Sequence, residues 1–176
     1  MKTIHLILCA LFAALTAVLT QISVPVGAVP FNLATFSVLC AGALLGAKLG
    51  AISQIVYVLL GLVGAPVFSG FRGGPQVLSG PTGGYIVGYV LAAFVVGLVV
   101  ERSKHSVFTL TLALIAGFFA YMIPGTLWFM YSTRSALIAA LMTCVVPFLI
   151  GDAIKIALAT TIAYRLRPML EKMLHR

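Results

Sequence analysis

The stretch SALIAALMTCVVPFLIGDAIKIALATTIAY, residues 135–164, is apolar except for a few hydroxyl groups and two opposite charges, Asp152 and Lys155. A charged side chain inside a bilayer costs about 2.5–3.5 kcal/mol on insertion scales, so a charge that stays there usually has a function. Three residues apart on a helix, the two side chains lie on one face. We expect an acceptor beside a cationic donor, both facing a cavity that holds a polar, neutral solute within the membrane.

The whole chain has the composition of a membrane protein. Of its 176 residues 62% are hydrophobic and 8% are charged, and its mean hydropathy is +1.18. A soluble domain is typically about 45–50% apolar and about 25% charged, and a membrane-spanning helix needs about 20 residues. We predict an all-α membrane protein, a single integral membrane substrate-binding domain over 1–176. Its six transmembrane helices are expected near residues 2–22, 31–48, 49–63, 81–100, 107–130 and 142–164, with a break at 24–30 and an interruption of the fifth at Pro124-Gly125.

The N-terminus also has features of a signal peptide, because Lys2 precedes an apolar run that continues to about Thr20. That run is longer than the roughly 7–15 residues of a typical signal core, and no A-x-A site follows it. A retained first span is therefore favoured over a cleaved peptide.

Basic residues are unevenly divided between the predicted loops. Positions 2, 48, 102, 104, 165, 167, 172 and 176 fall on one side of the membrane, whereas only Arg72 and Arg134 fall on the other. Because cytoplasmic loops carry the excess of Lys and Arg, both termini are predicted to be cytoplasmic. The clusters are short and lie next to spans, so nucleic acid is a poor partner. The basic tail has two open partners, anionic lipid or an acidic cytoplasmic protein.

The residues of most catalytic and metal sites are missing from the spans. All three histidines lie near the predicted membrane edges or outside the spans, and Asp152 is the sole acid within one. No Walker A pattern occurs, so ATP hydrolysis by that route is excluded. Three cysteines, Cys9, Cys40 and Cys144, lie singly in apolar spans and are predicted to be core residues. We expect no enzyme activity, no metal site and no cofactor.

The segment 64–85 is an external loop with seven glycines and three prolines, yet it is also apolar. Irregular backbone at membrane depth is tolerated only where protein buries it or where it lines a cavity. We therefore predict that the loop folds inward over a site, an ordinary interfacial connector being the alternative. Its candidate site residues are Gly73 and Gly74, whose backbone a ligand can approach, Tyr85 as a wall, and Arg72, the loop's only charge.

The first span carries two patterns of small residues four apart, Ala10 with Ala14 and Ala13 with Ala17. Small residues at this spacing let two helices approach closely. The pattern alone leaves two interpretations open, packing within this chain and docking to another membrane subunit.

Four segments together resemble the BioY family, the biotin-capturing substrate subunits of energy-coupling-factor (ECF) transporters. They are VPFNLATF (29–36), LVGAPVF (62–68), GPTGGY (80–85) and GDAIK (151–155), in this order across nearly the whole chain. The resemblance implies six helices in a bacterial plasma membrane, bound biotin near the outer face, and docking through the alanine patterns to a transmembrane coupling protein that works with ATPase subunits. With biotin as the ligand, we expect Asp152 and Lys155 to accept from and donate to its ureido ring. Arg72, the only charge in the loop, is a candidate partner for the carboxylate, a solvated loop charge being the alternative.

A rival function is autonomous proton-coupled vitamin transport, in which Asp152 is the proton carrier. Against it, the sequence has no clear internal repeat, which many secondary transporters have. A channel is less favoured still, because polar residues form no ladder along the spans.

Overall fold

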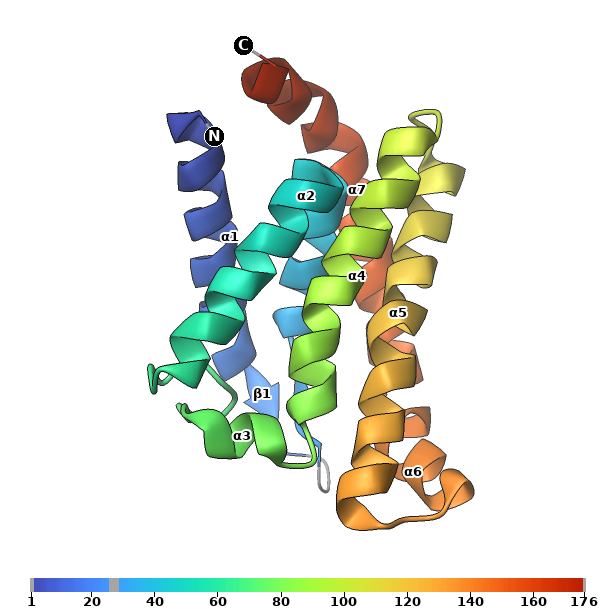
Figure 1. The fold of residues 1–176 in the computed structure, drawn as a ribbon. Coiled ribbons are helices and arrows are strands. Elements are labelled where there is room, and N and C mark those ends of the chain that lie inside the picture. Colours follow the sequence, from blue (N-terminus) through green and yellow to red (C-terminus); the bar gives the residue numbers. More distant parts are fainter. Residues whose placement is uncertain (1, 26–28, 176) are drawn as a thin grey trace.

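The computed structural model describes residues 2–25 and 29–175, and side chains up to residue 171; it is mostly helical (Figure 1). Five described segments are long and apolar enough to cross a membrane, the last of them covering 137–171. The helices are α1 (Thr3–Gln21), α2 (Ala34–Leu62), α3 (Pro75–Ser79), α4 (Gly83–Arg102), α5 (Val107–Thr133), α6 (Leu137–Cys144), the short 3₁₀ helix η1 (Val146–Phe148) and α7 (Leu149–His175).

α2 consists of two helical halves that meet at Gly46, whose φ of 84° and ψ of −179° are not helical. Such a positive φ favours glycine, which has no Cβ. The halves lie against each other, because a Cβ on Gly50 would approach the Ala41 carbonyl oxygen at 3.0 Å. The predicted boundary between the second and third spans, at 48/49, is therefore displaced by a few residues from the real turn.

The second half of α2 begins with a contact from α4. The Ala47 amide donates to Glu101 Oε1 over 2.8 Å, so the carboxylate satisfies one of the amides that a helix start leaves without a partner. Gly97 of α4 lies beside the same turn, where a Cβ would collide with the backbone of Gly46 and Ala47.

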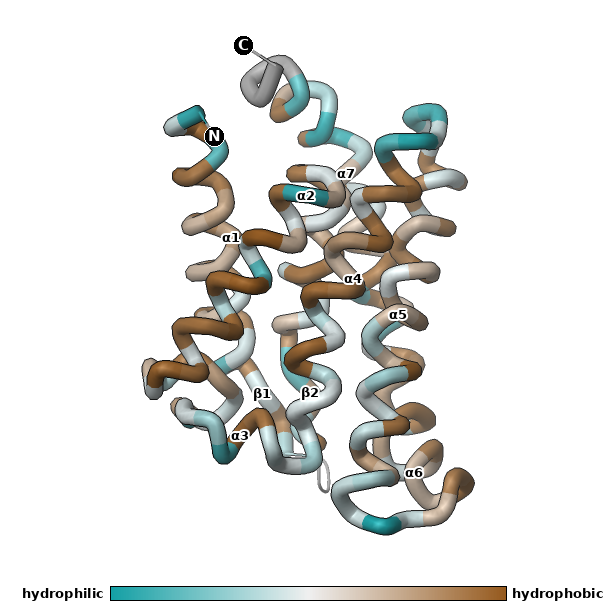
Figure 2. The backbone as a smooth tube through the Cα atoms, in the orientation of Figure 1, coloured by the Kyte–Doolittle hydropathy of each residue, from teal (hydrophilic) through white to brown (hydrophobic). Residues whose placement is uncertain are grey.

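α4 lies between α2 and α5 and forms the middle of the bundle (Figure 1). Both termini lie at one end of the bundle, and α3, α6 and the two strands lie at the other. Most of the hydrophilic colouring in Figure 2 lies at these two ends. The arrangement fits a bundle that presents apolar helix sides to lipid and polar ends to water.

The break predicted at 24–30 lies between two short strands, β1 (Ser23–Val24) and β2 (Phe31–Asn32), which pair antiparallel; residues 26–28 lie outside the described part. The loop before α4 does fold inward, as predicted. Its residue Phe68 is only 1% exposed, and the Gly74 amide donates to the Gly61 carbonyl over 2.7 Å.

Two details of the C-terminal half differ from the sequence prediction. α5 continues through Pro124, although an interruption was expected there; neighbouring helices can make a proline tolerable inside a membrane helix. The last long helix starts at Leu149 rather than near residue 142. Pro147 lies in η1, and the residues before η1 form a separate short helix, α6.

Removing the Glu101 acceptor is expected to loosen the turn of α2. Glu101→Ala should lower stability by about 1 kcal/mol, as loss of a helix cap typically does, which corresponds to roughly 2–4 °C in melting temperature for a chain of this size. Glu101→Gln keeps an acceptor oxygen and should lose less. The measurement is thermal unfolding in detergent, and equal melting of Glu101→Ala and the parent would contradict the role given to this contact.

Candidate functional site

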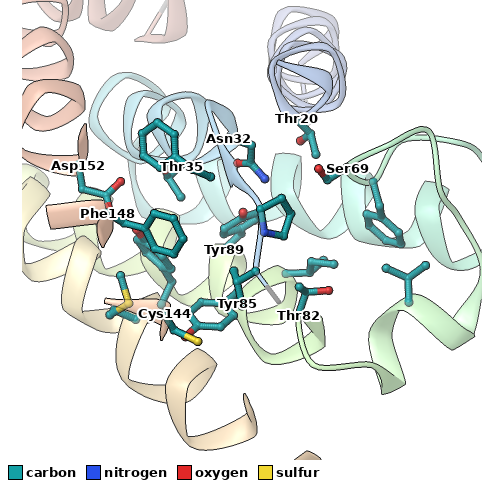
Figure 3. Close-up of a pocket in the computed structure, with 18 of the residues that line it drawn as sticks. Thr20, Asn32, Thr35, Ser69, Thr82, Tyr85, Tyr89, Cys144, Phe148 and Asp152 are labelled. Carbon is teal, nitrogen blue, oxygen red and sulfur yellow. The ribbon is translucent and has the colours of Figure 1, made fainter. Parts of the chain in front are cut away.

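A cavity opens at the end of the bundle opposite the termini. Its lining comes from the end of α1, from β2, α2, the loop before α4, α4, α5, α6, η1 and α7. Together with the open solvent at its mouth, it encloses about 670 Å³ of space that no atom fills. Figure 3 shows Asp152, Phe148 and Cys144 at one side of it, and Ser69 and Thr82 at the other.

Asp152 and Lys155 form the ion pair that the sequence predicted, and both line the cavity. Lys155 Nζ lies 2.9 Å from Asp152 Oδ1, and the two residues are 4% and 5% exposed. Asp152 is in the first turn of α7, where the positive end of the helix dipole favours a carboxylate. The 3₁₀ helix η1, which contains Pro147, leads directly into this helix, so the pair lies within four to seven residues of the turn beside the cavity.

Two residues from the first quarter of the chain complete the surroundings of Lys155. Its ammonium donates to Thr35 Oγ1 over 3.0 Å and lies 3.9 Å from the centre of the Phe31 ring. A cation over an aromatic face is attracted by the ring quadrupole. Phe31 is itself stacked on Phe148, with ring centres 5.7 Å apart, so the ring has little freedom to leave the ammonium.

Aromatic rings form a wall of the cavity. Phe68, Tyr57, Tyr89 and Tyr121 follow one another, with successive ring centres 5.7, 6.4 and 5.9 Å apart. Tyr85, predicted as a wall, also lines the cavity. The wall offers apolar ring faces to a ligand, together with hydroxyl groups that can donate or accept.

Hydroxyl partners fix parts of this wall. Tyr57 Oη lies 3.1 Å from Thr20 Oγ1 and 3.3 Å from the carbonyl oxygen of Val67. Tyr85 Oη lies 3.0 Å from Thr126 Oγ1. These bonds hold two of the rings at the cavity before any ligand arrives.

Sequence reasoning missed Phe31, Thr35 and most of the wall. Lys155 and Thr35 are 120 residues apart in the chain, and nothing in a single sequence places them together. Part of the wall did leave a signal, since Tyr85 and Tyr89 are four apart on an apolar helix and so share a face. Tyrosine hydroxyls buried in an apolar span usually need a partner, which is a second sign of a polar cavity.

Among the predicted loop residues, Arg72 lies at the cavity mouth. It is exposed, it contributes to the lining, and its Nε donates to the Ser69 carbonyl over 3.0 Å. Gly73 and Gly74 are absent from the described residues that line the cavity. Gly73 packs against the backbone of 64–65, and Gly74 bonds to the end of α2. A contact between either glycine and a ligand stays a prediction.

The four alanines of α1 divide into two pairs with opposite environments. Ala13 is 1% exposed and Ala17, which is half-buried, packs against the same core. This pair packs within the chain, and the buried Ala13 offers no surface for docking. Ala10 and Ala14 are exposed. The predicted packing within the chain is confirmed for Ala13, but the spacing could not tell which face of α1 the rest of the chain covers. Docking through Ala10 and Ala14 stays a prediction.

Comparison with known proteins adds the family context. A family model described as the BioY family matches residues 1–172. A protein named biotin transporter BioY from Thermotoga maritima is 40% identical over 168 residues, which cover 94% of this chain and 96% of that protein. A probable biotin transporter BioY from Pyrococcus horikoshii is 41% identical over 167 residues, 95% of this chain and 98% of that protein.

A solved structure has the same architecture. The crystal structure of the S-component for biotin from an ECF-type ABC transporter superposes with a TM-score of 0.88 at 29% identity, and the match covers 96% of this chain and 95% of that one. The agreement extends over nearly the full length in both sequence and fold, and the chain therefore belongs to the BioY family.

Proposed function

We propose that this chain binds biotin in the cavity and is the substrate-binding subunit of an ECF-type transporter for biotin uptake. The observation that carries the proposal is the buried Asp152–Lys155 pair facing a cavity with an aromatic wall. Relatives named as biotin transporters, and an S-component for biotin with the same fold, supply the ligand and the transporter class.

The chemistry of biotin complements the cavity. Its ureido ring has two N–H donors and a carbonyl acceptor; Asp152 accepts and Lys155 donates, so a neutral group meets a pair with no net charge. The sulfur-containing ring and the aliphatic chain suit the faces of the aromatic wall. The carboxylate at the far end of the ligand then comes to the mouth, where Arg72 is a partner able to make charge-assisted hydrogen bonds.

The proposed topology is a multi-pass plasma-membrane protein with six spans, in which the two halves of α2 are counted separately. The start of α1, the turn of α2, the end of α4 and the later part of α7, which carry or adjoin the basic positions 2, 48, 102, 104, 165 and 167, lie toward one end of the bundle (Figure 1). The positive-inside rule makes that end cytoplasmic. The cavity, at the opposite end, then faces the outside, from which the vitamin arrives.

Energy is proposed to come from partners, namely a transmembrane coupling protein and ATPase subunits. The sequence contains no Walker A pattern. Proton coupling through Asp152 is less favoured, because its carboxylate is held 2.9 Å from Lys155 in a buried pair, and neutralising it would leave that ammonium without its counter-charge. A binding subunit with no catalytic function of its own fits these features.

Loss of either charge should weaken biotin binding. We expect Asp152→Asn and Lys155→Ala each to reduce affinity about 10- to 100-fold, because hydrogen bonds to charged groups contribute about 1.5–3 kcal/mol. Isothermal titration of detergent-purified protein is the measurement. Thr160→Ala is the matched control, since Thr160 is buried on the same helix and is not among the described residues that line the cavity.

Breaking a buried pair also destabilises a protein, typically by about 3–5 kcal/mol, so melting must accompany the titration. The double variant Asp152→Asn, Lys155→Met removes both charges and leaves none unpaired. If it melts like the parent and binds biotin with unchanged affinity, the assignment of the ureido ring to this pair is wrong.

Arg72 should distinguish ligands that differ only in their terminal charge. Arg72→Gln is expected to lower affinity for biotin about tenfold and to leave affinity for biotin carboxamide nearly unchanged, because only the carboxylate forms an ion pair with the guanidinium. Arg134→Gln, which alters the other arginine of the same predicted side, is the control. Equal losses for both ligands would show that Arg72 acts on the loop and not on the carboxylate.

A bulky residue on the exposed strip of α1 should uncouple binding from transport. Ala14→Trp is expected to abolish ATP-driven biotin uptake in proteoliposomes that contain the partner subunits, while affinity of the isolated chain is retained, since close helix contact depends on small side chains. Leu112→Trp, at an exposed position on α5, is the control.

The same vesicles test the rival function. Uptake should require ATP and the partners, and a protonophore should leave it unchanged. Accumulation by the chain alone under an imposed pH gradient would establish proton coupling instead, and normal uptake by Ala14→Trp would mean that the strip faces lipid.

A further inference from the structure

A second hollow adjoins the cavity at its mouth, between α3 and the start of α4. Three residues, Arg72, Val77 and Thr82, line both spaces. The hollow therefore continues the cavity past the point where the carboxylate of a bound biotin is expected. We call it the mouth cleft.

The placement of two labelled residues in Figure 3 limits how a ligand can lie. Asp152 lies at one side of the cavity, whereas Thr82 lies at the opposite side. A ligand whose ureido ring contacts the Asp152–Lys155 pair must point its chain toward Thr82 and Arg72. Any group attached to the end of that chain would extend into the mouth cleft, because this is the space that shares those two residues.

The lining of the mouth cleft offers hydrogen-bond partners to an amide-linked substituent. The rest of its lining is Gly73, Gln76, Gly80 and Pro81, which present backbone and one side-chain amide. Arg72 is the one titratable side chain among the described residues that line it. Gln76 Nε2 donates to the Gly73 carbonyl over 2.8 Å, which leaves its Oε1 available to accept.

We propose that the mouth cleft is a subsite for amide conjugates of biotin, of which biotin joined to the side-chain amine of lysine is the simplest natural example. The inference rests on the proposed binding of biotin in the main cavity. Conversion of the carboxylate to an amide keeps a carbonyl oxygen that Arg72 can donate to, and adds an N–H donor for the acceptors of the cleft. The substrate class then includes fragments that proteolysis of biotin-bearing proteins releases, as well as the free vitamin.

Titration with biotin and with biotinyl-lysine tests the subsite on the full chain in detergent. We expect the parent to bind both, with affinities within about tenfold of each other. Gln76→Trp places a large ring in the cleft and should weaken biotinyl-lysine about tenfold or more, as overpacking does, with biotin affected much less. Ser79→Trp is the matched control, because Ser79 is exposed on the same short helix and is not among the described residues lining either space.

The outcomes separate the subsite from the main site. If biotin binds and biotinyl-lysine does not, or if Gln76→Trp and Ser79→Trp weaken both ligands alike, the mouth cleft is not a subsite and the binding of biotin stands. If neither ligand binds to the folded parent, the proposed function itself fails. Selective loss of biotinyl-lysine in Gln76→Trp supports the subsite.

Discussion

The rest of this structure depends on keeping two opposite charges inside an apolar bundle. The attraction between Asp152 and Lys155 offsets only part of the cost of taking both from water, so the remaining donors of the ammonium also need partners. One is the hydroxyl of Thr35, and the face of Phe31 covers the ammonium. These residues adjoin the start of α2, so satisfying the pair fixes the first quarter of the chain against the last long helix.

This arrangement is costly if stability is its sole purpose. A buried ion pair can often be replaced by apolar residues with no loss of stability, and here the pair lines a cavity instead of a packed core. Tyr57, Tyr89 and Tyr121 add hydroxyl groups to the same surface, although phenylalanine would be easier to bury there. Polar groups placed around an opening, with apolar ring faces between them, are the features of a site for a ligand that has both kinds of surface.

The sequence predicted what is local in this fold and missed what depends on distant contacts. Gaps between charges located the long helices, and the spacing of Asp152 and Lys155 placed both on one face, since both signals lie within single segments. The turn of α2 was predicted a few residues too late, because its position depends on Gly46 and on the carboxylate of Glu101 from another helix. Ala13 was assigned to a docking face because its spacing carries no information about which side the chain's own core covers.

α1 links the exposed strip to the cavity through its last residue. Gln21 Nε2 donates to the Phe68 carbonyl over 3.2 Å, and Gln21 Oε1 accepts from the Phe71 amide over 2.9 Å. Phe68 lines the cavity and packs its ring against Tyr57. A displacement of the last turn of α1 must therefore either break both bonds or move the loop that carries Phe68. The helix with the exposed alanines and the loop over the cavity are in this way joined directly by Gln21, and Thr20 of the same helix reaches the loop through the Tyr57 hydroxyl.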